Sequence, residues 1–131
     1  MNADKMTLRV QNALNEAFNI AVSNNNQQLE PIHLLSALMV QEDGLIGSII
    51  DKMGIDRTSI QNDIDDEVSK LPKVTGDGVN VTASVKINKI LIEAEKISGE
   101  FKDSYISVEH LFLAMINLES SKGLSTSNVG K

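Results

Sequence analysis

Hydrophobic residues recur every three or four positions near the start of the chain, and the same spacing returns near residue 90. The first set is Val10, Ala13, Leu14, Ala17 and Ala21. The second set is Ile87, Ile90, Leu91, Ala94 and Ile97. Such spacing puts all members of a set on one face of an α-helix. The pattern predicts two amphipathic helices, with Thr7 and Ser84 at the expected N-caps.

A polar stretch follows each amphipathic segment, "SNNNQQ" in the first case and "GEFKDS" in the second. After each polar stretch comes a segment that is apolar nearly all round, residues 31–42 with "HLLSALMV" and residues 108–119 with "HLFLAMI". A helix with little polar surface is normally buried. Each half of the chain is therefore expected to have a central, buried helix.

The sequence pattern of the first half predicts two further helices. "GLIGSIIDKMGID" has the spacing of a short helix that stops at Gly54. "DRTSIQNDIDDEVSKL" places Ile60, Ile64 and Val68 on one face of another. Residues 72–82, "PKVTGDGVNVT", mix Pro, Gly and β-branched residues, which is typical of a linker that can include a short extended piece. No other segment has a strong strand pattern, so the predicted fold class is all-α.

A shift of 77 residues aligns the two halves without a gap. Between residues 7–42 and 84–119, eight of 36 pairs are identical, where composition alone gives about two. The identical pairs are Leu14/Leu91, Glu16/Glu93, Ala17/Ala94, Ile20/Ile97, His33/His110, Leu34/Leu111, Ala37/Ala114 and Glu42/Glu119. The chain is therefore expected to be one domain made of two tandem copies: copy one in residues 1–71, the linker in 72–82 and a partial copy two in 83–131.

Copy two is shorter than copy one. "GLSTSNV" at residues 123–129 loosely matches "GLIGSII" at residues 44–50, after which the chain stops. Two interpretations stay open: a fragment of a longer polypeptide whose second copy is truncated, or a Ser- and Gly-rich disordered tail.

The two histidines of the chain, His33 and His110, match because the whole segments match. If Glu30 is the N-cap of the first buried helix, Pro31 takes the first helical position, which suits proline, and His33 takes the third. With Ser107 as N-cap, His110 takes the same position. A polar side chain there can reach back to the N-cap backbone, as in a capping box. The predicted role of both histidines is to fix the start of a buried helix.

Composition excludes several classes of function. The net charge is −6 without a basic cluster, and aromatic residues make up 3%, so nucleic-acid binding is disfavoured. No apolar run reaches the roughly 18 residues of a membrane span, and the N-terminus lacks the apolar stretch of a signal peptide. Cysteine is absent, which fits a cytoplasmic protein. We therefore expect no nucleic-acid partner and no membrane partner.

The sequence also lacks a recognisable active site. Two histidines from separate copies supply neither the four ligands of a structural zinc site nor the three of a catalytic one. No nucleophile elbow occurs, and "TGDGVN" lacks the lysine and the following helix of a phosphate loop. Asp65, Asp66 and Glu67 form an acidic run of the kind usually found on solvated helix surfaces. We expect no catalytic residue, no metal and no cofactor, with an unrecognised enzyme left as an alternative.

The tandem pattern of "EPIHLLSALM…GLIGSIIDKMGID" and "YISVEHLFLAM" resembles the Clp repeat. That repeat forms the N-terminal domain of the Clp/Hsp100-type AAA+ unfoldases, and the resemblance covers residues 1–129. Within the family the chain is most similar to the disaggregase branch. "NNQQLEPIHLLSAL", the "LPKVTGDG" linker and "DSYISVEHLFLAM" support that choice.

The resemblance implies two pseudo-twofold-related four-helix repeats, tethered ahead of ATPase rings that bind ATP and Mg²⁺ and that this sequence does not contain. It implies a domain that binds unfolded or aggregated polypeptide and delivers it to the AAA+ hexamer. The family's polar contact cluster corresponds here to Thr7, Asp103 and Glu109, and a neighbouring apolar groove to Leu91. Thr7 as a plain N-cap, Glu109 as a first-turn acid and Leu91 as core stay open as structural alternatives.

Two other functions stay open beside client binding. The domain could dock one folded adaptor protein that carries the client, as in protease-coupled Clp proteins. It could also be a spacer that binds nothing.

Overall fold

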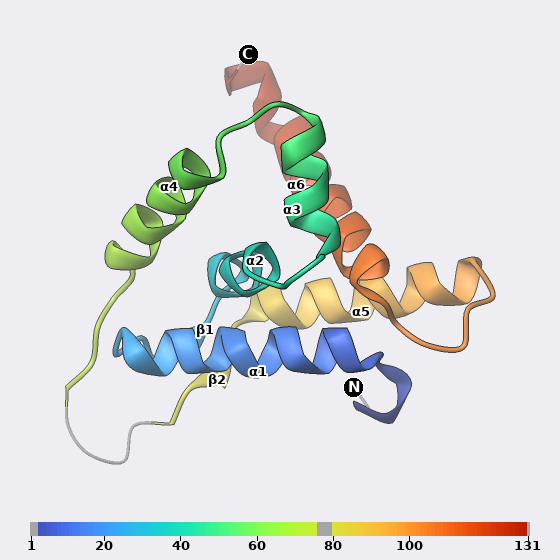
Figure 1. Ribbon diagram of the computed structural model, residues 1–131, viewed down its shortest axis with the longest axis horizontal. Helices are drawn as coiled ribbons and strands as arrows, with labels where there is room; N and C mark the ends of the chain where they lie inside the picture. Colours follow the sequence, from blue (N-terminus) through green and yellow to red (C-terminus); the bar gives the residue numbers. More distant parts are fainter. Residues whose placement is uncertain (1–2, 76–79, 131) are drawn as a thin grey trace. The chain divides into compact units, whose positions relative to one another are not determined.

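The computed structural model describes residues 3–75 and 80–130, apart from the side chains of Ala3 and of residues 120–130. Helices make up most of it, which confirms the all-α prediction (Figure 1). The elements are η1 (Ala3–Lys5), α1 (Leu8–Ser23), β1 (Gln28–Leu29), α2 (Pro31–Met39), α3 (Leu45–Lys52), α4 (Arg57–Ser69), β2 (Thr82–Ala83), α5 (Val85–Glu100) and α6 (Val108–Gly130). The chain divides into two compact units, one of Met1–Val10 with Asn88–Lys131 and the other of Gln11–Ile87.

The apolar stripes of α1 and α5 are buried as the spacing predicts. Val10, Ala13, Ala17, Ala21, Ile87, Ile90, Ala94 and Ile97 each expose 4% or less of their surface. Thr7 and Ser84 are the N-caps: the Thr7 hydroxyl accepts from the Val10 N–H at 3.3 Å, and the Ser84 hydroxyl accepts from the Ile87 N–H at 3.2 Å. Each cap satisfies one of the backbone donors that a helix start leaves unpaired.

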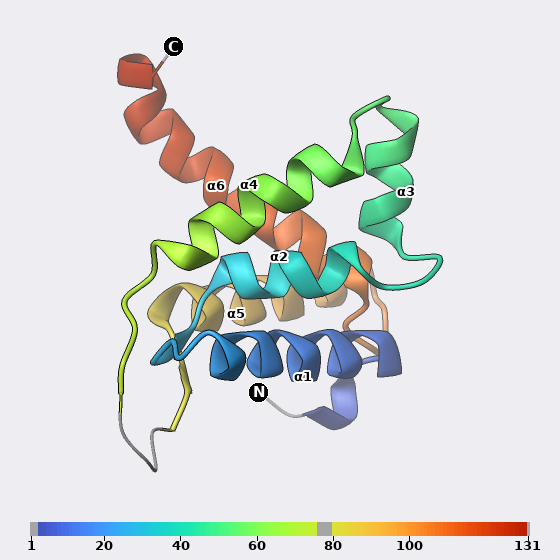
Figure 2. The same ribbon diagram turned by 60° about the vertical axis from the view of Figure 1, so that its left-hand side comes forward.

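The unit of residues 11–87 has α2 at its centre. Leu34 and Leu38 of α2 are at most 1% exposed, as expected for a helix that is apolar nearly all round. Helix α4 lies across α2 and buries Ile64 and Val68, with α3 beside them (Figure 2). Helix α3 ends where the sequence predicts, because Gly54 adopts the positive φ of 72° that a left-handed C-terminal turn needs.

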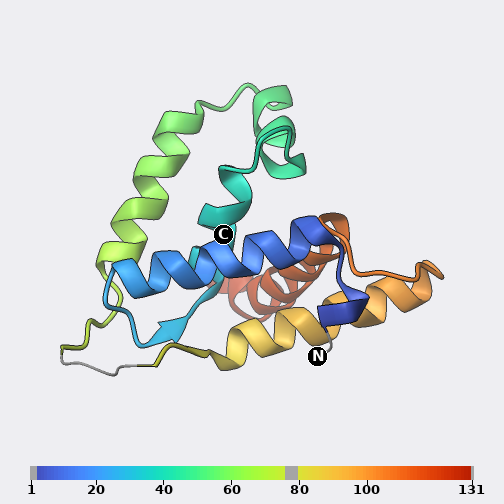
Figure 3. The same cartoon turned by 60° about the horizontal axis from the view of Figure 1, so that its bottom comes forward.

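A short parallel strand pair closes the same unit. Gln28 pairs with Thr82 and Leu29 with Ala83, and the Ser84 N–H donates to the Leu29 carbonyl at 3.0 Å (Figure 3). Strand β2 begins at the end of the predicted linker, where an extended piece was expected. The sequence did not predict β1, because Leu29 is the only apolar residue in that polar stretch and its partner lies more than fifty positions away.

The other unit repeats this pairing with the copies exchanged. Met6 forms a parallel bridge with Ile106, the Thr7 N–H donates to the Ile106 carbonyl at 3.0 Å, and the Ile106 N–H donates to the Lys5 carbonyl at 2.7 Å. Thr7 and Ile106 correspond to Ser84 and Leu29 at the 77-residue shift. The loop of each copy is therefore hydrogen-bonded to the segment that precedes the first helix of the other copy.

The central helix of copy two departs from the expectation in its length. The predicted helix 108–119 is longer than expected, since the backbone of α6 continues to Gly130. In copy one, α2 ends at Met39 and a turn with Asp43 at a φ of 55° leads into α3. The expected match of residues 123–129 with 44–50 concerns side chains that lie outside the described part of the chain.

Candidate functional site

The buried helix of copy one begins with a histidine cap. The Glu30 N–H donates to Nδ1 of His33 at 2.9 Å, which is the contact predicted from the sequence. His33 is fully buried. Its Nε2 lies 2.8 Å from the amide oxygen of Asn26, in the loop before the helix. The imidazole thus ties the loop to the first turn of α2.

Copy two has the same cap with the same distances. The Ser107 N–H donates to Nδ1 of His110 at 2.9 Å, and Nε2 of His110 lies 2.8 Å from Oδ2 of Asp103. Asp103 corresponds to Asn26 at the 77-residue shift. Both histidines thus accept the hydrogen bond from the N-cap backbone that the sequence predicts.

The hydrogen bonds determine the form of both rings. A backbone N–H can only donate, so Nδ1 must accept and the proton lies on Nε2, which donates to Asn26 or Asp103. Burial lowers the pKa of His33, and the nearby Glu30 carboxylate offsets this only in part. A proton added at Nδ1 of His33 would face the Glu30 N–H and break the cap.

The partner of each histidine has a different environment. Asn26 is 2% exposed, and its amide nitrogen donates to the Pro72 carbonyl at 3.2 Å. The side chain of Asp103 is 51% exposed. The same position is therefore closed in copy one and open to solvent in copy two.

The linker closes the loop of copy one. The Val74 N–H donates to the Asn25 carbonyl at 2.8 Å, and Nζ of Lys73 donates to the Asn24 carbonyl at 3.2 Å. Lys73 also forms an isolated antiparallel bridge with Asn26.

The structure brings three of the four predicted contact residues into one neighbourhood. Thr7 is hydrogen-bonded through its backbone to Ile106, midway between Asp103 and Glu109 in the chain. Thr7 is half-buried, whereas Glu109 is exposed in the first turn of α6. The fourth, Leu91, is half-buried on α5 in the same unit, and its apolar surface is only partly used by the core.

Two exposed aromatic residues flank Asp103 and were missed by the sequence analysis. Phe101 is 57% exposed and Tyr105 is 56% exposed. The Phe101 ring stands edge-on to the His110 imidazole, with the ring centres 5.7 Å apart. The alignment of the two copies could have revealed them. At the 77-residue shift, Phe101 and Tyr105 replace the polar Asn24 and Gln28 of copy one.

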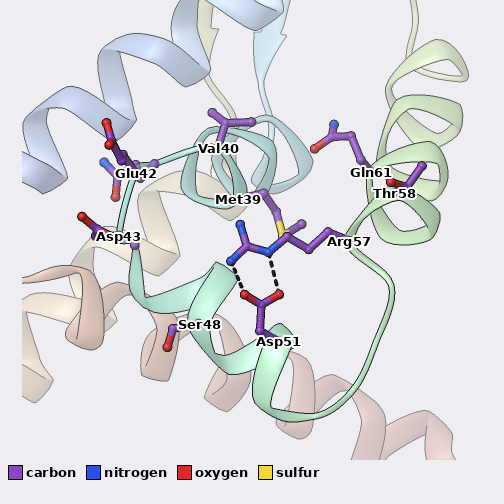
Figure 4. Close-up of a pocket in the computed structure, with 11 residues that line it drawn as sticks. Met39, Val40, Glu42, Asp43, Ser48, Asp51, Arg57, Thr58 and Gln61 are labelled. Carbon is purple, nitrogen blue, oxygen red and sulfur yellow. Dashed lines mark hydrogen bonds and ion pairs between the residues drawn. The ribbon is translucent and has the colours of Figure 1, made fainter.

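A hollow of about 880 Å³ lies in the unit of residues 11–87, between the end of α2, the loop after it, α3 and the start of α4 (Figure 4). Arg57 donates to both carboxylate oxygens of Asp51, at 2.7 and 2.6 Å. This pairing lowers the pKa of Asp51. A Cβ at Gly47 would lie 2.8 Å from the Arg57 guanidinium, so a larger residue there would require the flexible Arg57 side chain to shift. The one arginine at the rim is already neutralised, so this hollow offers little for an anion.

Two features are absent from the described residues, 3–75 and 80–130. No helix there is long and apolar enough to cross a membrane. No three His, Asp or Glu side chains in those ranges come close enough together to hold a metal ion.

The fold and the paired caps define a class, an all-α domain built from two copies of one helical unit. The chain matches the family described as the Clp repeat (R) N-terminal domain over residues 5–126. A chaperone protein ClpB from Clostridium perfringens is 55% identical over 124 residues, which cover 92% of this chain. A ClpB from Clostridium tetani is 46% identical over the same share. The chain therefore belongs to the Clp repeat N-terminal domain family.

Solved structures give the same fold. The Hsp104 N-terminal domain from Candida albicans has a TM-score of 0.80 at 22% identity, with 96% of this chain and 82% of that one covered. At that identity the likeness concerns the fold alone. The chain spans 14% of the length of the ClpB relatives it matches.

Proposed function

We propose that this domain recognises unfolded or aggregated polypeptide and delivers it to the hexamer of a ClpB-type AAA+ disaggregase. The family and the names of the relatives support a chaperone context. The observation that carries the proposal is the open loop of copy two, where Phe101 and Tyr105, two positions before and after Asp103 in the chain, are each more than half exposed beside an exposed carboxylate. Exposed rings beside a polar group are typical of surfaces that bind other polypeptides.

Thr7, Leu91, Asp103 and Glu109 are the proposed client contacts. An unfolded segment offers apolar side chains and unpaired backbone N–H groups. Leu91 and the two rings provide apolar surface, worth about 25 cal/mol per Å² buried. The carboxylates of Asp103 and Glu109 can accept hydrogen bonds from the client backbone. Because the client must be ordered on binding, the affinity is expected to be weak, which suits handover to a second site.

The test is an NMR titration of this chain with a destabilised protein in its unfolded form and, separately, with the same protein folded. Shift changes around Thr7, Leu91, Asp103 and Glu109 with the unfolded form alone support the proposal. Glu109→Gln should weaken binding several-fold, whereas Glu95→Gln, a matched exposed acid on α5, should leave it unchanged. No change with the unfolded form contradicts client capture. Tight binding of one folded partner instead would favour adaptor docking.

A further inference from the structure

The structure contains an internal template for how an extended segment binds beside a histidine cap. In copy one, the linker lies along the loop of residues 24–26. Its Val74 N–H donates to the Asn25 carbonyl, and its Lys73 amine donates to the Asn24 carbonyl. Its Pro72 carbonyl accepts from the Asn26 side-chain amide. The chain thus uses a stretch of sequence Pro-Lys-Val as the cover of this loop.

The corresponding loop of copy two has the same backbone without the cover. Asn25 and Lys102 both adopt left-handed conformations, at φ of 57° and 60°. The N–H groups of Asn26 and Asp103 both donate at 2.9 Å to a carbonyl in the last turn of the preceding helix. Yet no backbone N–H within residues 3–75 and 80–130 donates to the carbonyls of Phe101 or Lys102, and residues 101–105 are all exposed.

We propose that the loop Phe101–Tyr105 binds an extended, basic polypeptide segment, in the way that the linker residues 72–74 lie on the loop of residues 24–26. This inference rests on the proposed function and specifies which part of a client it binds. The occupant pairs with the loop as a single antiparallel bridge. Its backbone N–H donates to the Lys102 carbonyl, and its preceding side chain, a lysine or arginine, reaches the Phe101 carbonyl.

The exchange of Asn26 for Asp103 determines the preference for a basic segment. In copy one the side-chain amide donates to a neutral peptide carbonyl. A carboxylate cannot donate, so in copy two that contact is lost and an acceptor takes its place. Because His110 uses Oδ2, the remaining carboxylate oxygen and the Phe101 carbonyl are both acceptors at the negative end of α5. A cationic side chain is the group that such an arrangement favours.

The aromatic residues complete the site. Phe101 and Tyr105 replace the polar residues Asn24 and Gln28 of copy one, and each exposes more than half of its surface. A flat ring can hold the aliphatic part of a lysine or face its ammonium group. The one cation in the loop is Lys102, whose side chain is exposed to solvent. Its charge weakens the attraction of the loop for a cationic client side chain, but it does not occupy the Phe101 and Lys102 carbonyls.

The test uses a peptide of sequence LPKVT, which repeats residues 71–75, with both ends blocked so that its lysine carries the only charge. It is titrated into the full chain and followed by NMR. We expect shift changes at residues 101–105, with no comparable change when glutamate replaces the lysine. Asp103→Asn is the matched variant, because an amide oxygen still accepts from His110 as Asn26 does from His33. It should fold normally and weaken the peptide by about fivefold, as expected for loss of a charge-assisted contact.

Several results would overturn the proposal: equal binding of the lysine and glutamate peptides, shift changes confined to residues 24–26, or full affinity in Asp103→Asn. Shift changes at residues 101–105 that grow with protein concentration, without peptide, would assign the loop to a second copy of this chain and overturn it too. If an unfolded client lacking lysine and arginine binds but LPKVT does not, this inference fails while the proposed function stands. If neither binds, both fail.

Discussion

The turn after α1 and the turn after α5 share one backbone design but differ in what surrounds them. Each has a left-handed residue, a backbone bond of 2.9 Å back to the helix and a histidine that joins the turn to the next helix. In copy one the linker covers the turn and leaves Asn26 2% exposed, whereas in copy two Asp103 remains 51% exposed. The same element is therefore closed in copy one and open to solvent in copy two.

The largest difference should appear when each histidine is removed. His33→Ala takes away the cap and leaves the buried Asn26 oxygen without its donor, so we expect a loss of about 3–4 kcal/mol in the free energy of unfolding. His110→Ala leaves Asp103 in contact with water, and about 1–2 kcal/mol should be lost. Urea unfolding of both variants measures the difference. Equal losses would mean that exposure of the partner residue does not matter.

Exchanging the partner residues isolates the effect of the cover. Asn26→Asp loses the donor to the Pro72 carbonyl and buries a carboxylate beside it, at an expected cost of about 2–3 kcal/mol. Asp103→Asn keeps the bond to His110 in solvent, and its effect should stay within about 0.5 kcal/mol. Thermal and urea unfolding give both values. A larger effect for Asp103→Asn than for Asn26→Asp would reverse the roles assigned to the two copies.

The pH dependence of stability should reflect His33. Burial lowers the pKa of the folded His33 below that of the unfolded chain, so the unfolded state binds more protons between the two values. The stabilisation by neutral His33 is therefore complete above about pH 6.5 and decreases as the pH falls towards the folded pKa. Unfolding curves at successive pH values measure the slope. His33→Gln, which keeps an acceptor for the cap, should reduce this slope, and an unchanged slope would exclude His33 as its source.

The smallest expected effect concerns the left-handed residue of each turn. Lys102 has φ of 60° with a side chain that this conformation disfavours, whereas the corresponding Asn25 tolerates it. Lys102→Gly should raise the free energy of unfolding by about 0.5–1 kcal/mol. Asn25→Gly should change it by no more than a few tenths. A stabilisation by Asn25→Gly as large as that by Lys102→Gly would show that the side chain does not decide the strain.

The sequence predicted those features that depend on local spacing. The stripes of α1 and α5, the caps at Thr7 and Ser84 and the histidine contacts all arise within three or four residues of one another, so periodicity and capping rules apply directly. The end of α3 at Gly54 followed from one residue with a special backbone preference.

Other features depend on contacts between distant parts of the chain. Strand β1, the bridge of Met6 to Ile106 and the cover of Asn26 by the linker join residues many positions apart, and no local pattern encodes them. The exposed pair Phe101 and Tyr105 was missed because aromatic residues were considered only as a low overall percentage, which disfavours nucleic-acid binding. Their positions were not compared between the two copies. The client contacts Thr7, Leu91, Asp103 and Glu109 came from the family resemblance and remain a prediction.

The most direct test of the difference between the copies is the amide hydrogen exchange of Asn26 and Asp103, whose N–H groups make matching bonds of 2.9 Å. It is measured by NMR on the free chain and with an excess of an unfolded, lysine-containing client. We expect slower exchange at Asn26 than at Asp103 in the free chain, and a client-dependent slowing at Asp103 alone. Equal protection of both amides in the free chain, or a client that protects Asn26 as much as Asp103, would contradict this expectation.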